Sequence, residues 1–196
     1  MIVAVGGHSR NVGKTSVAAG LIHAFRKYPW TAIKISAHRH ASIPNLGKDS
    51  EGDFCDIYEE YNREGSSDTS RFLAAGASRS LWMRINDDAT DTALQQLLPI
   101  LQLCPFVLLE SNRILRVIRP DLFIMVLRFD TMDFKESART YLRQADAVVA
   151  VNPDAAPPPW DGISETLSKI PQFVTAAPQV MPAGLVDFVQ CRLPGD

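Results

Sequence analysis

Residues 1–21 constrain the fold of this chain more than any other stretch. They begin with a short apolar run, Ile2 to Val5, that is rich in β-branched residues and typical of a buried strand. The pair Gly6-Gly7 interrupts this run, and Gly13-Lys14-Thr15 then opens a segment with small and aliphatic residues at helical spacing. The stretch therefore predicts a strand, a glycine-rich loop and a helix, in that order.

A loop of this kind is suited to bind phosphate groups. Backbone N–H groups at the start of a helix point toward a bound anion. Lys14 is placed to reach the β- and γ-phosphates of a nucleotide, the Thr15 hydroxyl to ligate Mg²⁺, and Gly13 to let the backbone approach closely. The alternative is a glycine-rich turn that carries Gly-Lys-Thr by chance. The candidate nucleotide-binding residues of the loop are Gly7, Arg10, Asn11, Val12, Gly13, Lys14, Thr15 and Ser16.

The spacing of the loop glycines differs from that of the usual Walker A motif. Five residues, 8–12, separate Gly7 from Gly13, where the usual motif has four. This spacing and the Val-Gly-Lys-Thr ending resemble dethiobiotin synthetase and its relatives, among them the nitrogenase iron protein and several cofactor-maturation GTPases. Ser9 stands where the nitrogenase-type ATPases carry a loop lysine. Arg10 is a candidate to neutralise phosphate in its place, and the alternative is a solvent-facing arginine.

Length and composition indicate one domain of ordinary size. A chain of 196 residues can bury a sizeable core. Its formal charge of -2, with scattered basic residues, indicates neither a nucleic-acid nor a membrane partner. Cys55, Cys104 and Cys191 lack metal-type spacing and suit reduced thiols. The sequence shows no signal-peptide pattern and no apolar run of about 18 residues, so we expect a cytoplasmic protein.

Apolar runs and helical patterns alternate along the rest of the chain. The predicted strands after the first are Trp30–Ser36, Ser80–Ile85, Pro105–Glu110, Leu122–Leu127, Ala147–Val151 and Gln172–Thr175. The predicted helices are Thr15–Lys27, Ser67 or Asp68 to Ala75, Thr92–Leu103, Ser137–Gln144, Ser164–Lys169 and Gly184–Gln190. The acidic stretch 54–67 is also mostly compatible with a helix. We therefore predict a single three-layer α/β domain of the P-loop NTPase type, with a mainly parallel sheet flanked by helices.

Two charged residues interrupt or end the apolar strands. Glu110 follows a wholly apolar run, where P-loop proteins place a carboxylate for Mg²⁺ or for orienting water. Lys34 lies inside the second strand and either extends to solvent or points into the nucleotide site. Lys14, Lys34 and Glu110 are the candidate catalytic residues, and Thr15, Glu110 and Asp53 are the candidate Mg²⁺ ligands. For Asp53, as for Asp49 in the same loop, the alternative is a solvated acid.

Two further positions leave their chemistry open. His38 and His40 could contact metal or phosphate, but alternate residues in a loop without a third ligand predict no preorganised metal site. Asn152 follows a buried strand at the place where related proteins read the base, and an amide can bond both edges of a purine. Pro153 occupies the lysine position of the Asn-Lys-x-Asp guanine motif. Base identity, GTP or ATP, is therefore left open.

Several segments together resemble molybdopterin-guanine dinucleotide biosynthesis protein B, a family of small P-loop proteins. In that family a lysine and histidine-rich motif follows the second strand, an Asp-Ser or Asp-Thr segment leads into Ala-Gly-Ala, and a later strand ends in Val-Glu-Gly. The resemblance covers roughly the first 110 residues, with departures at Ser111 and at residues 50–67. It implies a GTP-binding adaptor with a protein partner in molybdenum cofactor maturation. The matching positions here are Lys34, His38, His40, Asp68, Ala75-Gly76-Ala77 and Glu110.

Two other functions compete with the adaptor. Dethiobiotin synthetase resembles the chain in loop spacing and in Lys34, which falls at that family's catalytic lysine, and this implies an ATP-dependent ligase. Ile35 and the pair Ser111-Asn112 depart from the ligase pattern. The third candidate is a nucleotide-gated interaction protein without useful turnover. For all three we expect Mg²⁺ with GTP or ATP, and by analogy of fold a homodimer.

Overall fold

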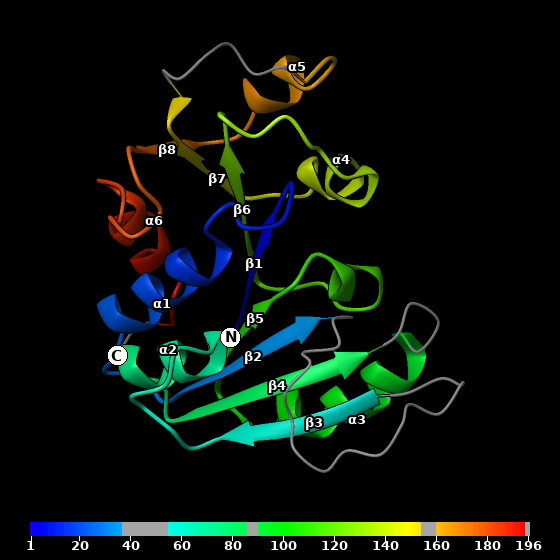
Figure 1. The fold of residues 1–196 in the computed structure, drawn as a ribbon, viewed down its shortest axis with the longest axis vertical. Coiled ribbons are helices and arrows are strands. Elements are labelled where there is room, and N and C mark those ends of the chain that lie inside the picture. Colours follow the sequence, from blue (N-terminus) through cyan, green and yellow to red (C-terminus); the bar gives the residue numbers. More distant parts are fainter. Residues whose placement is uncertain (37–54, 86–89, 154–159, 195–196) are drawn as a thin grey trace.

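The computed structural model describes residues 1–36, 55–85, 90–153 and 160–194 (Figure 1). Its strands are β1 (Ile2–Gly7), β2 (Trp30–Ser36), β3 (Cys55–Glu60), β4 (Arg79–Ile85), β5 (Phe106–Glu110), β6 (Leu122–Arg128), β7 (Ala147–Val151) and β8 (Gln172–Thr175). Its helices are α1 (Lys14–Ala24), α2 (Asp68–Ala75), α3 (Thr90–Leu103), the short 3₁₀ helix η1 (Arg113–Arg116), α4 (Glu136–Leu142), α5 (Ser164–Leu167) and α6 (Leu185–Gln190). Within the described ranges, no helix is both long enough and apolar enough to cross a membrane.

The described strands form one sheet in the order β3-β4-β2-β5-β1-β6-β7-β8. Every neighbouring pair is parallel except β3 and β4, which run antiparallel at one edge. Strand β1 lies between β5 and β6, so the chain crosses from one side of β1 to the other when it passes from β5 to β6. Ligands of open α/β sheets bind beside the carboxyl ends of strands at such a switch point. The predicted mainly parallel sheet is confirmed.

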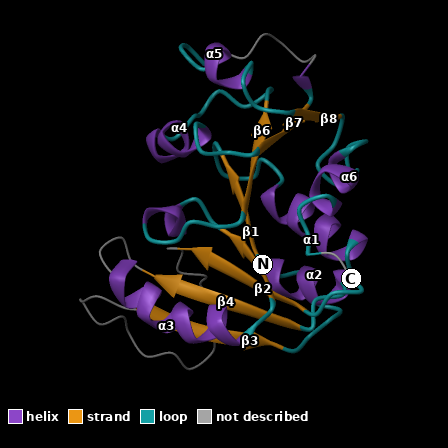
Figure 2. Ribbon diagram, turned by 180° about the vertical axis from the view of Figure 1, so that it is seen from behind, coloured by secondary structure: helices purple, strands orange, loops and turns teal. Residues whose placement is uncertain are grey.

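Helices cover both faces of the sheet and make three layers (Figures 1 and 2). Val3 and Val5 of β1 pack with α1, α2 and α6 in one buried cluster. Ala4, between them in sequence, belongs to the other cluster, which includes residues of α3, α4 and α5. Because successive side chains of a strand point to opposite faces, each inner strand contributes to two cores. This explains why the inner strands are continuously apolar.

The stretch 54–67, which the sequence suggested as compatible with a helix, instead contains the edge strand β3. Two of its acidic side chains pair across to β4: Glu59 with Arg79 at 2.9 Å and Asp56 with Arg84 at 2.7 Å. Tyr58 stacks on Trp82, with 5.4 Å between the ring centroids. These cross-strand pairs stabilise a strand in a segment whose own composition favours a helix.

Several local signals are confirmed as predicted. Strand β2 has the predicted bounds, and α2 begins after Ser67, whose hydroxyl accepts a hydrogen bond from the Ser70 N–H at 3.0 Å. Gly76 ends α2 with φ 113°, a left-handed conformation that favours glycine. Helix α1 ends at Ala24, before the predicted boundary at Lys27.

Candidate functional site

The loop between β1 and α1 lies at the carboxyl end of the central strand. Its backbone requires two left-handed residues, Asn11 with φ 57° and Gly13 with φ 103°. Val12 between them is buried and packs in the core cluster below the loop, so only its backbone faces the site. Lys14 then begins α1 and donates from Nζ to the Ser9 carbonyl at 2.7 Å. These contacts define the shape of the loop, and Lys14 lies across it.

Asn112 fixes the start of the loop from the neighbouring strand end. Its Oδ1 accepts from the Gly7 N–H at 2.8 Å, and its Nδ2 donates to the Gly7 carbonyl at 2.7 Å. A Cβ on Gly6 would lie 2.3 Å from Asn112 Oδ1, so the glycine allows the amide to approach. Sequence reasoning missed this role, because it noted Asn112 only as a departure from the ligase family.

A chain of polar contacts joins the loop to β5, β2 and α2. Glu110 is 1% exposed, and it accepts from the Thr15 hydroxyl at 2.7 Å and from Lys34 Nζ. The register of β2 and β5 places Lys34 opposite Glu110. The same ammonium pairs with Asp68 at 3.0 Å, which brings α2 into the site. Lys34 thus points into the site, one of the two alternatives that the sequence left open.

Burial and charge pairing set the protonation of these groups. Burial acts to lower the pKa of Lys34, but the carboxylates of Glu110 and Asp68 outweigh it, and the pKa of Lys34 is raised. For Asp68, burial acts to raise the pKa, but the positive charge of Lys34 acts to lower it and prevails, so the pKa of Asp68 is lowered. For Lys14 burial prevails over the attraction of Glu110 and lowers the pKa to about 8. Lys34 therefore holds its proton firmly, while Lys14 is an ammonium whose charge has no full compensation.

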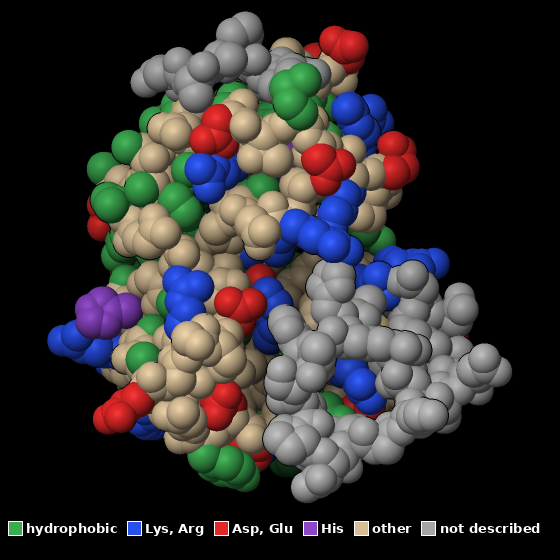
Figure 3. All heavy atoms as spheres, viewed as in Figure 1, with side chains coloured by type: hydrophobic (Ala, Val, Ile, Leu, Met, Phe, Trp, Pro, Cys, Tyr) green, Lys and Arg blue, Asp and Glu red, His purple; other side chains and the backbone are tan. Residues whose placement is uncertain are grey.

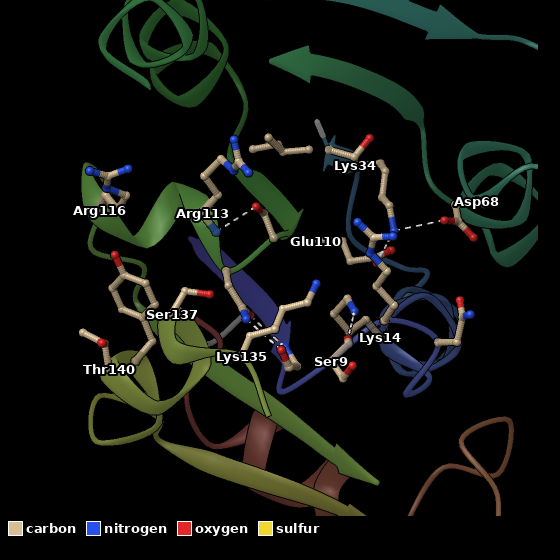
Figure 4. Close-up of a pocket in the computed structure, with 18 residues that line it drawn as sticks. Ser9, Lys14, Lys34, Asp68, Glu110, Arg113, Arg116, Lys135, Ser137 and Thr140 are labelled. Atoms are coloured by element: carbon tan, nitrogen blue, oxygen red, sulfur yellow. Dashed lines mark hydrogen bonds and ion pairs between the residues drawn. The ribbon is translucent and has the colours of Figure 1, made fainter. Parts of the chain in front are cut away.

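Two cavities surround this polar chain. The larger, about 630 Å³, extends from the loop to η1 and α4, and the smaller, about 290 Å³, lies beside Gly13, Ser16 and α2. Figure 4 shows the larger cavity, and Figure 3 shows Lys and Arg side chains around the hollow on this face. The two cavities share the lining residues Asn11, Lys14, Lys34, Asp68 and Glu110.

The oxygen ligands of the site fit a Mg²⁺ ion that keeps part of its water shell. The Thr15 hydroxyl and the Glu110 carboxylate lie together, with Asp68 beyond Lys34. Within the described residues no group of three or more His, Cys, Asp or Glu could hold a metal ion. The pair formed by the Thr15 hydroxyl and the Glu110 carboxylate suits Mg²⁺, because this ion uses one or two protein oxygens and takes its other ligands from phosphate and water. Asp49, Asp53, His38 and His40 lie outside the described residues.

The remaining predicted residues differ in whether they contact the two cavities. Ser16 accepts a hydrogen bond from Arg71 of α2 at 2.9 Å, a contact that the sequence did not predict. Arg10 and Asn11 are exposed at the rim of the larger cavity. Asn152 is not among the residues that line either cavity. It has φ 55°, and its amide donates to Asp130 at 3.4 Å.

Replacement of Gly13 by alanine is expected to destabilise the protein. A Cβ there would meet the Pro178 ring at 2.2 Å, and φ 103° is strained for any side chain. Gly162→Ala is the matched control, because φ is 76° but, its two chain neighbours aside, no atom of the described residues lies within 4 Å of the added carbon. The control should lose about 1 kcal/mol from strain alone, and Gly13→Ala more than that. Thermal unfolding measures both, and equal losses would contradict the packing of Pro178 on the loop.

Comparison with known proteins identifies the fold. No protein-family model and no curated protein matches this chain. The crystal structure of HypB from Helicobacter pylori in complex with nickel superposes with a TM-score of 0.54 and 14% identity, over 97% of this chain and 86% of that one.

A second solved structure also aligns with the chain. The "apo" form of LpxK from Aquifex aeolicus in complex with ATP gives a TM-score of 0.49 and 19% identity over 88% of this chain. The aligned part spans about half of LpxK, 53% of its length. The parallel sheet, the loop after β1 and the likeness to HypB agree with one another, and we conclude that the chain has the three-layer α/β fold of the P-loop NTPases.

Proposed function

We propose that the protein binds a purine nucleoside triphosphate with Mg²⁺ at the loop between β1 and α1. The observation that carries this proposal is the convergence of Lys14, the Thr15 hydroxyl and Glu110 on one cavity beside that loop. Backbone N–H groups of the loop and of the first turn of α1 are donors for phosphate oxygens. The ligand class is GTP or ATP.

We further propose slow hydrolysis of the bound nucleotide. Lys14 and the loop amides would stabilise charge on the phosphate oxygens, and Glu110 would hold the metal or orient a water. When bound, Mg²⁺ supplies further charge neutralisation at the same oxygens. Lys34 holds Glu110 and Asp68 in place and presents a second ammonium to the cavity.

For the biological role we propose an adaptor in cofactor biosynthesis of the molybdopterin-guanine dinucleotide type, with a protein partner and a homodimeric assembly in the cytoplasm. This role is supported by the resemblance in the first 110 residues. Its test is a hydrolysis assay with and without candidate partner proteins of that biosynthesis. Turnover that rises only with a partner supports the adaptor, and light scattering tests the dimer.

A thermal-shift screen with ATP, GTP and their non-hydrolysable analogues tests nucleotide binding directly. A ligand that binds only the folded state raises the unfolding temperature by mass action. We expect one purine triphosphate to do so in the presence of Mg²⁺. An unfolding temperature that none of them changes would overturn the proposal.

A second candidate, an ATP-dependent ligase of the dethiobiotin synthetase type, is favoured by two observations. The larger cavity continues past the loop to η1 and α4, and this leaves room for a small second substrate. Lys34 also lies in the site, as that family's catalytic lysine would. Phosphate release that requires a small carboxylate or amine would favour this candidate over the adaptor.

Nucleotide binding is expected to take up a proton near pH 8. Burial lowers the pKa of Lys14 to about 8, so at that pH about half of the free protein carries a neutral Lys14. Phosphate oxygens beside Nζ favour the charged form and raise this pKa. Binding should therefore consume about half a proton at pH 8, and Lys14 should contribute almost none at pH 6.5.

Calorimetry in buffers with different ionisation heats measures this proton uptake. When an ammonium group and Mg²⁺ bind the triphosphate, the triphosphate releases protons. Its contribution is therefore opposite in sign to the proton uptake by Lys14. Uptake that is no larger at pH 8 than at pH 6.5 would contradict the placement of Lys14 against the phosphates.

A further inference from the structure

The larger cavity has two sides with different chemistry. One side holds residues assigned above to the nucleotide site, among them Lys14, Lys34 and Glu110. On the opposite side lie Arg113 and Arg116 from η1 and residues from the start of α4 (Figure 4). Arg116 and the α4 residues line the larger cavity but not the smaller one beside Gly13 and Ser16. This second side is therefore distinct from the predicted phosphate position.

The charge of the second side is positive. Among the described lining residues, six are Lys or Arg and two, Asp68 and Glu110, are acidic. Both acids pair with Lys34 on the other side of the cavity. Within the described residues, no carboxylate forms an ion pair with Arg10, Arg116 or Lys135. Arg10, Arg116 and Lys135 therefore line the cavity without an ion pair to a described carboxylate, although the charge of Asp133 still acts on Lys135.

The environment of Lys135 shows that these cations lie near one another. Burial lowers the pKa of Lys135, and the positive charges of Arg10 and Arg113 lower it further, while Asp133 partly offsets them. Three cations from the loop, from η1 and from the residue before α4 therefore act on one another, and their mutual repulsion has an energetic cost. A bound anion removes that cost, because it replaces like-charge repulsion with attraction.

Hydroxyl groups extend this side of the cavity. Ser137, Thr140 and Tyr141 all line it, and their spacing of three and four residues places them on one face of α4. A hydroxyl can donate or accept a hydrogen bond. That of Thr140 already donates to the Glu136 carbonyl at 3.2 Å, so toward a ligand it acts as an acceptor. A ligand with an anionic group next to the cations and a polar body along α4 would form ion pairs with the cations and hydrogen bonds with the hydroxyl groups.

We propose that this second side binds a small molecule that carries an oxyanion, a phosphate or a carboxylate group, next to the nucleoside triphosphate. The inference rests on the proposed function, because it places the ligand beside a bound nucleotide. The cavity as a whole, with the nucleotide side included, has a volume of about 630 Å³, and the second side is the part of it that reaches η1 and α4. Arg116 and Lys135 bind the oxyanion, and Ser137 and Thr140 bond to the rest of the ligand.

The test measures oxyanion binding while the nucleotide site is filled. Inorganic phosphate and succinate are the two probes, titrated by calorimetry at constant ionic strength into protein saturated with Mg²⁺ and a non-hydrolysable triphosphate analogue. We expect saturable binding of at least one probe, and the probe that binds identifies the oxyanion as phosphate or carboxylate. Arg116→Gln and Lys135→Gln should each weaken it about tenfold, since each removes a charge-assisted hydrogen bond.

Arg143→Gln is the matched control, because Arg143 follows α4, is exposed and does not line the cavity. It should bind the probe as the unchanged protein does. Circular dichroism of all three variants shows whether each one folds, and the two cavity positions are exposed side chains whose loss the fold tolerates.

Three outcomes separate this inference from the proposed function. Absence of saturable binding for both probes, or equal weakening in Arg143→Gln, would overturn the second site while nucleotide binding stands. Phosphate binding that disappears when the analogue is present would do the same, because the β1–α1 loop then accounts for it. Failure of the unchanged protein to bind any triphosphate would overturn the proposed function itself.

Discussion

Replacement of Lys14 by alanine is expected to abolish binding of the Mg-nucleotide while the fold persists. Nζ lies across the loop and donates to the Ser9 carbonyl at 2.7 Å, the position from which it can turn to the β- and γ-phosphates. Each charge-assisted hydrogen bond contributes about 1.5–3 kcal/mol, so loss of both phosphate contacts should weaken binding at least about 100-fold. Titration calorimetry with GTP and ATP analogues measures the change.

The unfolding temperature should not fall in the same variant. Burial lowers the pKa of Lys14 to about 8, which means that the ammonium is costly to keep at this buried position. Its removal relieves that cost. Lys169→Ala is the control, because Lys169 is exposed and pairs only with Glu165 among the described residues. Undiminished affinity in Lys14→Ala, or equal weakening in Lys169→Ala, would count against the site.

The elements that the sequence predicted well are those with local signals. The cap at Ser67, the left-handed Gly76 and the unbroken apolar run of β7 each act within a few residues. The glycine-rich loop belongs to the same class, since Gly13 has the positive φ that a close approach of backbone requires. Short-range chemistry of this kind can be read without knowledge of the rest of the fold.

Strand β3 could not be predicted because its stability comes from a distant segment. The arginines Arg79 and Arg84 lie some twenty or more residues from their partners Glu59 and Asp56 in sequence. Isolated, the acidic residues of this stretch favour a helix. Pairing with β4 provides the opposite charges and the aromatic contact of Tyr58 with Trp82, and these outweigh the local preference.

The same limit applied to the site. Lys34 and Glu110 were each identified from a charged residue in an apolar strand, but their direct contact depends on the register of β2 and β5. Asp68 was recognised as a helix start and through a family resemblance, and its ion pair with Lys34 depends on the packing of α2. Asn112 and Arg71 had no sequence signal, because an amide or a guanidinium that holds a loop resembles any surface polar residue.

Glu110→Gln is expected to lower turnover far more than nucleotide affinity. The amide keeps the size of the side chain and an oxygen that can accept from the Thr15 hydroxyl, so the loop should retain its shape. It loses the negative charge that holds a metal or orients a water. Loss of such a group in acid–base or positioning roles costs about 10²-fold or more in rate. Single-turnover hydrolysis and equilibrium binding, measured on the same preparation, separate the two effects.

The variant also loses one of the two carboxylates that face Lys34, and the ion pair with Asp68 at 3.0 Å remains. We therefore expect a loss of about 1–3 kcal/mol in the free energy of unfolding, with a folded protein at room temperature. Glu59→Gln is the matched control, since it removes a carboxylate from an ion pair with Arg79 at the sheet edge, outside both cavities. Its turnover should be unchanged. Equal rates in Glu110→Gln and the unchanged protein would remove Glu110 from the reaction, because a carboxylate that merely holds Lys34 affects stability and not the chemical step.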